Sequence, residues 1–411
     1  MMMSIPARSV ARSQFFLTAR SFATASPVVG QNRNHKIVVI GGGSAGLAIS
    51  HQLLRQGKFH QDDIAIVDPA TWHHYQPGWT LVGGGLKTKE SLRKPLKNLI
   101  DPKFKFYNTG VDGFSPDQNF ITLKNGDKLN YDQLVVAPGI TVDVGSVKGL
   151  SFVPFKSFKK EKAIFTQPAG VIKCAGAPQK IMWLALDHWK RAGLYDAKNN
   201  SDSPINITFA TGLPSMFGVP KYSATLEELR RERSVEGLFQ HDLTAIDGNT
   251  ATFTRTDGQG QATKDFDLLH VVPKNKPHDF VKNSVLANEA VSHNVWSAGD
   301  ASSLPTSKTV AAITAEAPVL VRNLLLAIDG RDPEEVYDGY TSCPLLTEYG
   351  KVLLAEFKYG GIPKETFNKW FGINQAVPRK EFYYLKKDFF PWVYGKYMVK
   401  GNWGGPKGWI K

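Results

Sequence analysis

KIVVIGGGSAG, residues 36–46, joins a short β-branched run to a glycine-rich turn. Such a run is typical of a buried parallel strand, and the leucines and isoleucines that follow recur at the spacing of one helix face. Gly57 ends the helical pattern, and a second apolar run, residues 64–67, leads into Asp68, 22 positions after Gly46. The stretch predicts a strand–turn–helix unit that opens a parallel sheet.

The glycines of this turn have the GxGxxG spacing of a dinucleotide-binding site. Gly41 permits the tight turn, Gly43 lets the backbone approach a pyrophosphate, and Gly46 lets helix and strand pack closely. The positive end of the helix would face the phosphates, and Asp68 would accept hydrogen bonds from ribose hydroxyls. FAD and NAD share this fingerprint, so it predicts a dinucleotide without choosing between them.

Two later motifs choose FAD. Residues 131–139, which end in Ala-Pro-Gly, and residues 297–300 resemble secondary motifs of the two-dinucleotide-domain flavoprotein reductases. In that superfamily the aspartate of the late Gly-Asp pair, here Asp300, approaches the ribityl–phosphate chain of the flavin. The resemblance implies an α/β protein with two Rossmann-like domains, the first of them discontinuous.

The second glycine fingerprint of the pyridine-nucleotide-dependent members is missing. We interpret residues 205–209 as the strand that opens the second unit, and it is followed by residues 210–218, which lack the fingerprint. Pro214 also removes a backbone donor that a phosphate would need. We therefore expect the second domain to keep the fold without binding NAD(P)H.

Length and charge limit the classes of protein. The 411 residues allow two or three domains, and 42% apolar with 21% charged residues is ordinary for a globular enzyme. The net charge of +13 gathers at the two ends, since residues 1–61 contain no Asp or Glu. The longest apolar stretch, residues 311–328, is broken by Glu316 and Arg322, so we expect no transmembrane helix.

The N-terminus has the composition of a targeting sequence. Arg8, Arg12 and Arg20 lie among serines and phenylalanines without acids, as in a mitochondrial presequence. A disordered basic tail and a chloroplast address share this composition. Of these three interpretations, we favour a mitochondrial presequence for residues 1–30.

The chain has two cysteines, Cys174 in a stretch of small residues and Cys343 beside Pro344, and both stretches are interpreted as turns. Turns favour access, and Lys173 would favour the thiolate of its neighbour. Their separation forms neither a CxxC motif nor a zinc pattern, and we predict no metal site. From the residues alone, a redox pair and two unrelated thiols remain equally open.

Several long motifs resemble the eukaryotic sulfide:quinone oxidoreductases of the mitochondrial inner membrane, and the likeness runs from His35 to Trp409. These motifs are VIKCAGAPQKIMWL at 171–184, DGYTSCPLLT at 338–347, VLLAEF at 352–357, HHYQPGWTLVGGG at 73–85 and SLPTSKTVAA at 303–312.

The resemblance implies a redox pair, Cys174 and Cys343, bridged by a disulfide or trisulfide beside FAD. Hydrogen sulfide would open the bridge, one cysteine would pass sulfane sulfur to glutathione or sulfite, and the other, assigned to Cys343, would reduce FAD. Ubiquinone would then take the electrons. The FAD contacts that the resemblance carries over, beside the glycines, are Ser44, Ala45, Asp68, Gln76, Val111, Asp300 and Lys308.

Two connections are shorter than in that family: the stretch from Ile140 to Cys174 and the junction 290–291. A non-catalytic FAD-binding relative is therefore one alternative function. A type II NADH:quinone reductase is the other, which the missing second fingerprint disfavours.

The C-terminal stretch interleaves cations with ten aromatic residues, as suits the headgroup boundary of an anionic membrane. We expect residues 379–411 to form a monotopic anchor and part of the quinone entry, and no nucleic acid to bind. Removal of residues from Glu381 onward is expected to leave FAD bound. The domain limits expected after the presequence are 31–150 and 291–340 for the FAD domain, 151–290 for the second domain, and 341–411 for the cysteine and membrane segment.

Overall fold

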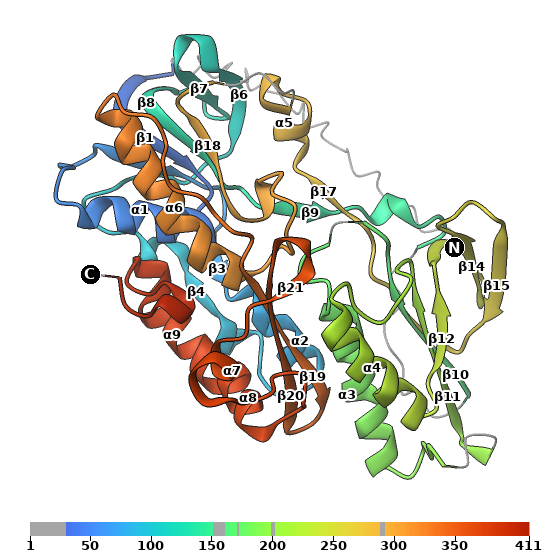
Figure 1. Ribbon diagram of the computed structural model, residues 1–411. Helices are drawn as coiled ribbons and strands as arrows, with labels where there is room; N and C mark the ends of the chain where they lie inside the picture. The colour runs from blue at the N-terminus through green and yellow to red at the C-terminus, as the bar shows by residue number, and fades with distance from the viewer. Residues whose placement is uncertain (1–29, 151–160, 171, 199–201, 288–291, 411) are drawn as a thin grey trace, which may run out of the picture.

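A computed structural model describes residues 30–150, 161–170, 172–198, 202–287 and 292–410 (Figure 1). The predicted presequence lies outside the described residues, except for Gly30. So do residues 151–160 of the shortened 140–174 connection, and the 290–291 junction.

The first sheet has seven strands in the order β5-β2-β1-β8-β7-β6, with β18 also paired to β8. Strands β1, β2, β5, β8 and β18 run parallel, and β6 and β7 are antiparallel additions. Strand β18 belongs to this first sheet although it follows all strands of the second sheet in the sequence. The bounds are β1 Asn32–Ile40, β2 Ile64–Val67, β5 Lys105–Tyr107, β6 Val111–Ser115, β7 Phe120–Leu123, β8 Lys128–Val136 and β18 Val295–Ser297.

Helices α1 (Ser44–Arg55) and α6 (Val310–Ile328) pack together against the first sheet (Figure 1). By length and composition α6 passes the test for a membrane span, as does no other helix among the described residues. Glu316 and Arg322 lie within this helix, so the two charges interrupt its apolar sequence but not the helix itself. However, 61% of its apolar window is buried inside the protein, as in a core helix.

The second sheet is parallel, in the order β12-β11-β10-β16. Its opening strand is β10 (Glu161–Gln167), which pairs with β11 (Ile205–Thr211). Our interpretation of residues 205–209 as the opening strand was therefore wrong. The charged start of β10 hid it in the sequence, and the loop after β10, which carries Cys174, also lacks a GxGxxG motif. The other two strands are β12 Glu236–Phe239 and β16 Leu268–His270.

The remaining elements frame these two sheets. An antiparallel sheet β13-β14-β15 lies beside the second sheet, and β19-β20-β21 brings the C-terminal part of the chain against α3. The bounds of the strands are β3 Trp72–His74, β4 Arg93–Pro95, β9 Ile140–Val142, β13 His241–Asp247, β14 Thr250–Arg255, β15 Gln261–Asp265, β17 Asn275–Pro277, β19 Thr341–Glu348, β20 Lys351–Lys358 and β21 Ile362–Pro363. Those of the helices are α2 Trp79–Gly83, α3 Ala177–Arg191, α4 Pro220–Glu232, α5 Asp279–Lys282, α7 Thr366–Phe371, α8 Lys380–Tyr384 and α9 Phe390–Lys396.

Candidate active site

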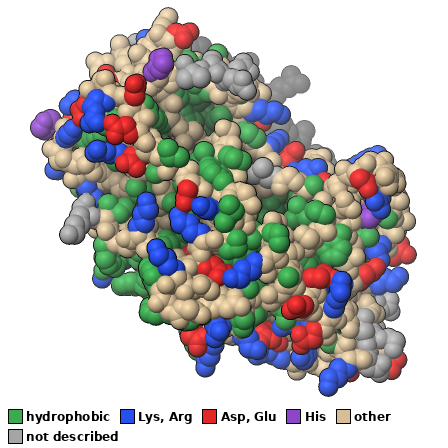
Figure 2. All heavy atoms as spheres, viewed as in Figure 1, with side chains coloured by type: hydrophobic (Ala, Val, Ile, Leu, Met, Phe, Trp, Pro, Cys, Tyr) green, Lys and Arg blue, Asp and Glu red, His purple; other side chains and the backbone are tan. Residues whose placement is uncertain are grey.

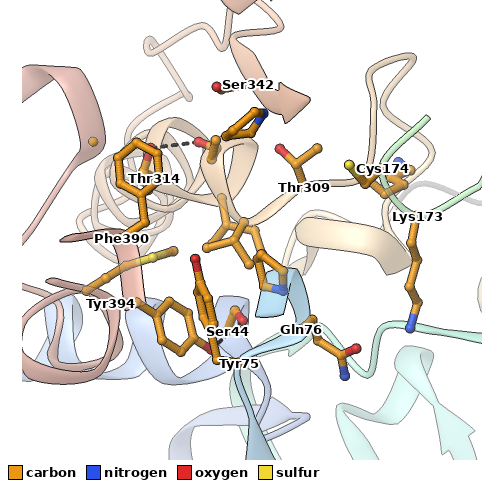
Figure 3. Close-up of a pocket in the computed structure, with 18 of the residues that line it drawn as sticks. Ser44, Tyr75, Gln76, Lys173, Cys174, Thr309, Thr314, Ser342, Phe390 and Tyr394 are labelled. Carbon is orange, nitrogen blue, oxygen red and sulfur yellow. Dashed lines mark hydrogen bonds between the residues drawn. The ribbon is translucent and has the colours of Figure 1, made fainter. Parts of the chain in front are cut away.

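A cavity of about 870 Å³ connects the predicted dinucleotide turn with the cysteine loop (Figure 3). Elements far apart in the sequence line it: the start of α1, the turn after β18, the loop after β10, and the C-terminal helices. The predicted site residues on its wall are Gly43, Ser44, Ala45, Gln76, Cys174, Asp300 and Lys308. The fold thus brings most of the predicted residues together.

The glycine turn fits a dinucleotide. A Cβ at Gly46 would lie 1.8 Å from the carbonyl oxygen of Gly41, so helix and turn approach as closely as the fingerprint requires. Gly41 itself has φ +104°, a conformation that favours glycine. A Cβ at Gly43 would meet nothing within 4 Å, which leaves the backbone open for a pyrophosphate. These residues fit the ADP portion of FAD.

Besides Gly41 and Gly46, two predicted FAD contacts, Asp68 and Val111, lie outside the cavity wall. The Asp68 carboxylate, at the end of β2, accepts hydrogen bonds from the backbone of Gly42 (2.6 Å) and Ala70 (2.7 Å). The Asp68 carboxylate therefore stabilises the glycine turn, and it would also accept hydrogen bonds from a ribose. The side chain of Val111 is buried in the sheet core, so its main chain is the part available to a cofactor.

Asp300 and Lys308 line the cavity, and the turn that presents Asp300 packs against the start of α1, since a Cβ at Gly299 would lie 3.1 Å from the Cβ of Ala45. Burial raises the pKa of Asp300 and lowers that of Lys308. The Lys308 ammonium donates hydrogen bonds to the carbonyls of Ser302 (2.6 Å) and Leu304 (3.0 Å). Glu316 of α6 accepts a hydrogen bond of 2.6 Å from the backbone of Gly299, which fixes the turn that presents Asp300.

The two cysteines meet although 169 positions separate them. Their Sγ atoms are 3.2 Å apart, and both are free thiols in this structure. Cys174 has φ +52°, a strained conformation for a residue with a side chain, and its backbone N–H donates to the carbonyl of Lys308 (3.0 Å). The turn predicted at Cys174 is confirmed, and it ends where α3 begins.

Cys343 is not in a turn, contrary to the sequence interpretation. It lies in β19, is 1% exposed, and pairs with Ala355 of β20. Pro344, which suggested the turn, is tolerated because β19 is an edge strand whose free side does not need every N–H. Cys343 does not line the cavity, whereas Cys174 does.

The cation beside the thiol is Lys180, not the predicted Lys173. Its ammonium donates to Cys174 Sγ at 3.2 Å and is 2% exposed. The side chain of Lys173 points away from Cys174 (Figure 3). The hydrogen bond from the Cys343 thiol, and then the charge of Lys180, hold the pKa of Cys174 well below its ordinary value. The hydrogen bond with Cys174, and then burial, raise the pKa of Cys343 well above its ordinary value.

A second lysine, Lys386, faces the same sulfurs from the C-terminal segment. It lies in the π-helical turn Leu385–Phe389, is 4% exposed, and lines the cavity. Burial, and then repulsion from Lys180, lower the pKa of Lys386 to about 7. A lysine with that pKa can exchange a proton near neutral pH.

A hydrogen-bonded chain ties the C-terminal segment to the glycine turn. The hydroxyl of Tyr394 in α9 lies 2.7 Å from Ser44 Oγ and 2.6 Å from His73 Nε2. His73 Nδ1 lies 2.9 Å from the carbonyl of Gly42 and so carries the proton that it donates there. Nε2 then accepts from Tyr394, which leaves the Tyr394 oxygen to accept from Ser44.

Sequence reasoning missed Lys180, Lys386 and Tyr394. Lys180 lies six positions after Cys174, which precedes α3, and this is not the three- or four-residue spacing of neighbours on a helix, so no signal in the sequence indicated the contact. Lys386 and Tyr394 sit among other cations and aromatic residues, and no local signal separates them from their neighbours.

Comparison with known proteins agrees with this geometry. Residues 35–173 match the family model of the pyridine nucleotide-disulphide oxidoreductases. The mitochondrial sulfide:quinone oxidoreductase of Schizosaccharomyces pombe is 41% identical over 92% of this chain and 93% of its own length. That of Mus musculus is 34% identical over 91% and 88%. The predicted mitochondrial location agrees with both names.

The fold is also known from crystallography. The sulfide:quinone oxidoreductase of Aquifex aeolicus superposes with a TM-score of 0.67 and 16% identity, over 88% of this chain and 91% of that one. The predicted α/β fold with FAD- and NAD-binding units is confirmed, and the family is flavin-dependent, with FAD as its cofactor. The cavity, its glycine turn and the extent of these matches lead to one conclusion: this chain belongs to the family of mitochondrial sulfide:quinone oxidoreductases.

Proposed function

We propose that this enzyme oxidises hydrogen sulfide at Cys174 and Cys343, with ubiquinone as electron acceptor and glutathione or sulfite as sulfur acceptor. The observation that carries the proposal is the 3.2 Å approach of the two Sγ atoms at one end of the cavity that begins at the glycine turn. With glutathione (GSH), the balance is H₂S + GSH + quinone → GSSH + quinol.

The bridge between the cysteines can be opened by hydrosulfide. In a direct disulfide, HS⁻ bonds to one sulfur as the S–S bond breaks, which leaves one cysteine as a persulfide and the other as a thiolate. A third sulfur bonded to both would place the outer atoms about 3.3 Å apart, given S–S bonds of about 2.05 Å. The observed 3.2 Å supports room for a trisulfide as well.

We assign the thiolate to Cys174, in place of the sequence-based assignment to Cys343. Cys174 lines the cavity and lies beside Lys180, whereas Cys343 is buried behind it. The Lys180 ammonium stabilises the negative sulfur, and Lys386 would take the proton that the attacking sulfide releases. FAD, when bound, supplies a two-electron acceptor that a quinone can reoxidise.

We also propose the remaining FAD contacts, together with the domain limits expected from the sequence. Ser44, Ala45 and Gly43 would face the pyrophosphate, Asp68 a ribose, and Asp300 with Lys308 the ribityl and flavin portion. Gln76 lines the cavity and would contact the flavin, and the main chain of Val111 would contact the adenosine half. We also propose that residues 379–411 rest on the inner membrane and admit the quinone.

The test is sulfide-dependent reduction of decylubiquinone by purified, FAD-loaded protein. Bleaching of the flavin by sulfide, followed by quinone reduction, is expected. Bleaching by NADH alone would favour the type II NADH:quinone reductase. Bound FAD that neither reductant bleaches would favour the non-catalytic relative, and the shortened connections would then be its cause.

A further inference from the structure

A second cavity, of about 440 Å³, lies behind Tyr394. Tyr75 and Tyr394 line both cavities, so their rings form a wall between the two. None of the proposed FAD contacts lines the second cavity. It is formed by the hairpin region around β4 on one side and by α9 and the residues after it on the other. The FAD site does not account for it.

Three lysines, Lys94, Lys396 and Lys400, surround this cavity, and no acidic residue lines it. None of the three forms an ion pair within the described part of the chain. The Lys94 ammonium has one long hydrogen bond, 3.5 Å to the carbonyl of Gly395. Three lysines around one cavity whose lining contains no acidic residue favour an anion there.

Part of the cavity wall is apolar, and exposed aromatic rings lie beside it. Leu92, Leu99 and Val399 are buried in its wall. Trp392 on its rim is 48% exposed, and Trp72, on the strand paired with the one that carries Lys94, is 40% exposed. Figure 2 shows hydrophobic and basic side chains side by side over α9. Aromatic rings beside basic side chains are typical of surfaces that bind the interface of an anionic membrane.

The geometry points to a binding site for the phosphate headgroup of an anionic membrane phospholipid. The phosphate lies between Lys94, Lys396 and Lys400, and the glycerol backbone rests on the apolar wall. The acyl chains leave past Trp392 toward the bilayer. A soluble phosphate would use the same lysines but would have no use for the apolar wall or the exposed tryptophan.

This inference deepens the membrane contact proposed above and does not depend on sulfide oxidation. Its test uses dihexanoyl-phosphatidylglycerol below its micelle concentration, so that one lipid molecule binds without a bilayer. Titration into the FAD-loaded protein, followed by ³¹P NMR, should show saturable binding with one molecule per chain. Glycerol phosphate and dihexanoyl-phosphatidylcholine should each bind at least tenfold more weakly.

The triple variant K94Q/K396Q/K400Q should weaken phosphatidylglycerol binding at least tenfold. The matched control K124Q/K190Q/K282Q removes the same charge from exposed lysines elsewhere and should bind as the parent does. Equal binding of glycerol phosphate would show that the occupant is a soluble phosphate and would overturn the lipid proposal. Undiminished binding by the triple variant, or equal losses in both triple variants, would overturn the site itself. The far-UV circular dichroism spectrum and the FAD content of the triple variant check that it has folded.

Discussion

The ammonium nitrogen of Lys180 lies 3.2 Å from the Sγ atom of Cys174, where water scarcely reaches the lysine. We therefore expect Lys180→Met to raise the pKa of the Cys174 thiol, since the thiolate loses its counter-charge. Each unit by which that pKa exceeds the working pH lowers the thiolate fraction about tenfold. The measurement is the pH dependence of iodoacetamide alkylation in the reduced protein, beside sulfide oxidation at pH 7.

Lys173→Met is the matched control, because this lysine is adjacent in sequence but points away from the sulfur. It should leave the alkylation profile of Cys174 nearly unchanged. If Lys173→Met shifted the profile as far as Lys180→Met, the assignment of the counter-charge to Lys180 would be wrong.

Lys386 should make stability depend on pH above neutrality. Its pKa is lowered to about 7, so between pH 7 and its unfolded value near 10.4 the unfolded chain binds more protons than the folded one. This group therefore makes stability rise with pH across that window, by up to about 1.4 kcal/mol per pH unit. Lys386→Met should raise the thermal midpoint relative to the parent more at pH 7 than at pH 9.5, as differential scanning fluorimetry can measure. A difference in thermal midpoint that is the same at both pH values would contradict the lowered pKa of the buried Lys386.

Cys174 and Cys343 should act as a unit. Cys174→Ser and Cys343→Ser should each abolish sulfide oxidation, and the double variant should lose little more, because neither sulfur can bridge alone. FAD content, read from the flavin absorbance, should stay at the parental level in all three proteins. Near-normal turnover by either single variant would exclude the pairing.

Tyr394→Phe should weaken FAD binding. The substitution leaves His73 Nε2 without its donor and frees Ser44 from the position in which Tyr394 holds it. A lost buried hydrogen bond costs about 1 kcal/mol, so we expect the FAD dissociation constant to rise about fivefold. Flavin fluorescence measures it, and Tyr397→Phe, which alters a half-buried tyrosine of the same segment, is the control.

The same contact changes the expectation for a truncated chain. Removal of residues from Glu381 onward deletes Tyr394 as well as Lys386, and it uncovers α1 where Gly401 packs against Gln52. We now expect the truncated protein to lose FAD as well as membrane affinity. A truncated protein that keeps FAD at the parental affinity would restore the simpler picture of a detachable anchor.

The FAD-binding part of the fold could be predicted from the sequence because its signals are local. The glycine turn, the strand before it and the helix after it lie within some 20 residues, and steric necessity fixes each glycine. The longest apolar stretch of the sequence, residues 311–328, coincides with the long helix α6, which spans Val310–Ile328. By contrast, β10 begins Glu-Lys, and its membership of a sheet depends on β11 and β16, which lie far along the chain.

The cysteine environment was not readable in the same way. Pro344 beside Cys343 indicated a turn, and only the position of β19 at a sheet edge shows why a strand accepts it. Lys173 was the nearest cation in sequence, but helix geometry carries Lys180 to the sulfur instead. The role of Lys386 depends on packing between segments more than 200 positions apart, which no local pattern encodes.

The Ser44–Tyr394 contact closes across 350 positions, so the flavin turn obtains its last support from almost the final part of the chain to be synthesised. A ribosome releases the glycine turn long before that support exists, and contacts of such separation form slowly. A premature stop codon in the last few dozen codons would therefore do more than shorten a tail. It would yield a nearly full-length chain whose cofactor turn is unsupported, a product that protein quality control is expected to remove.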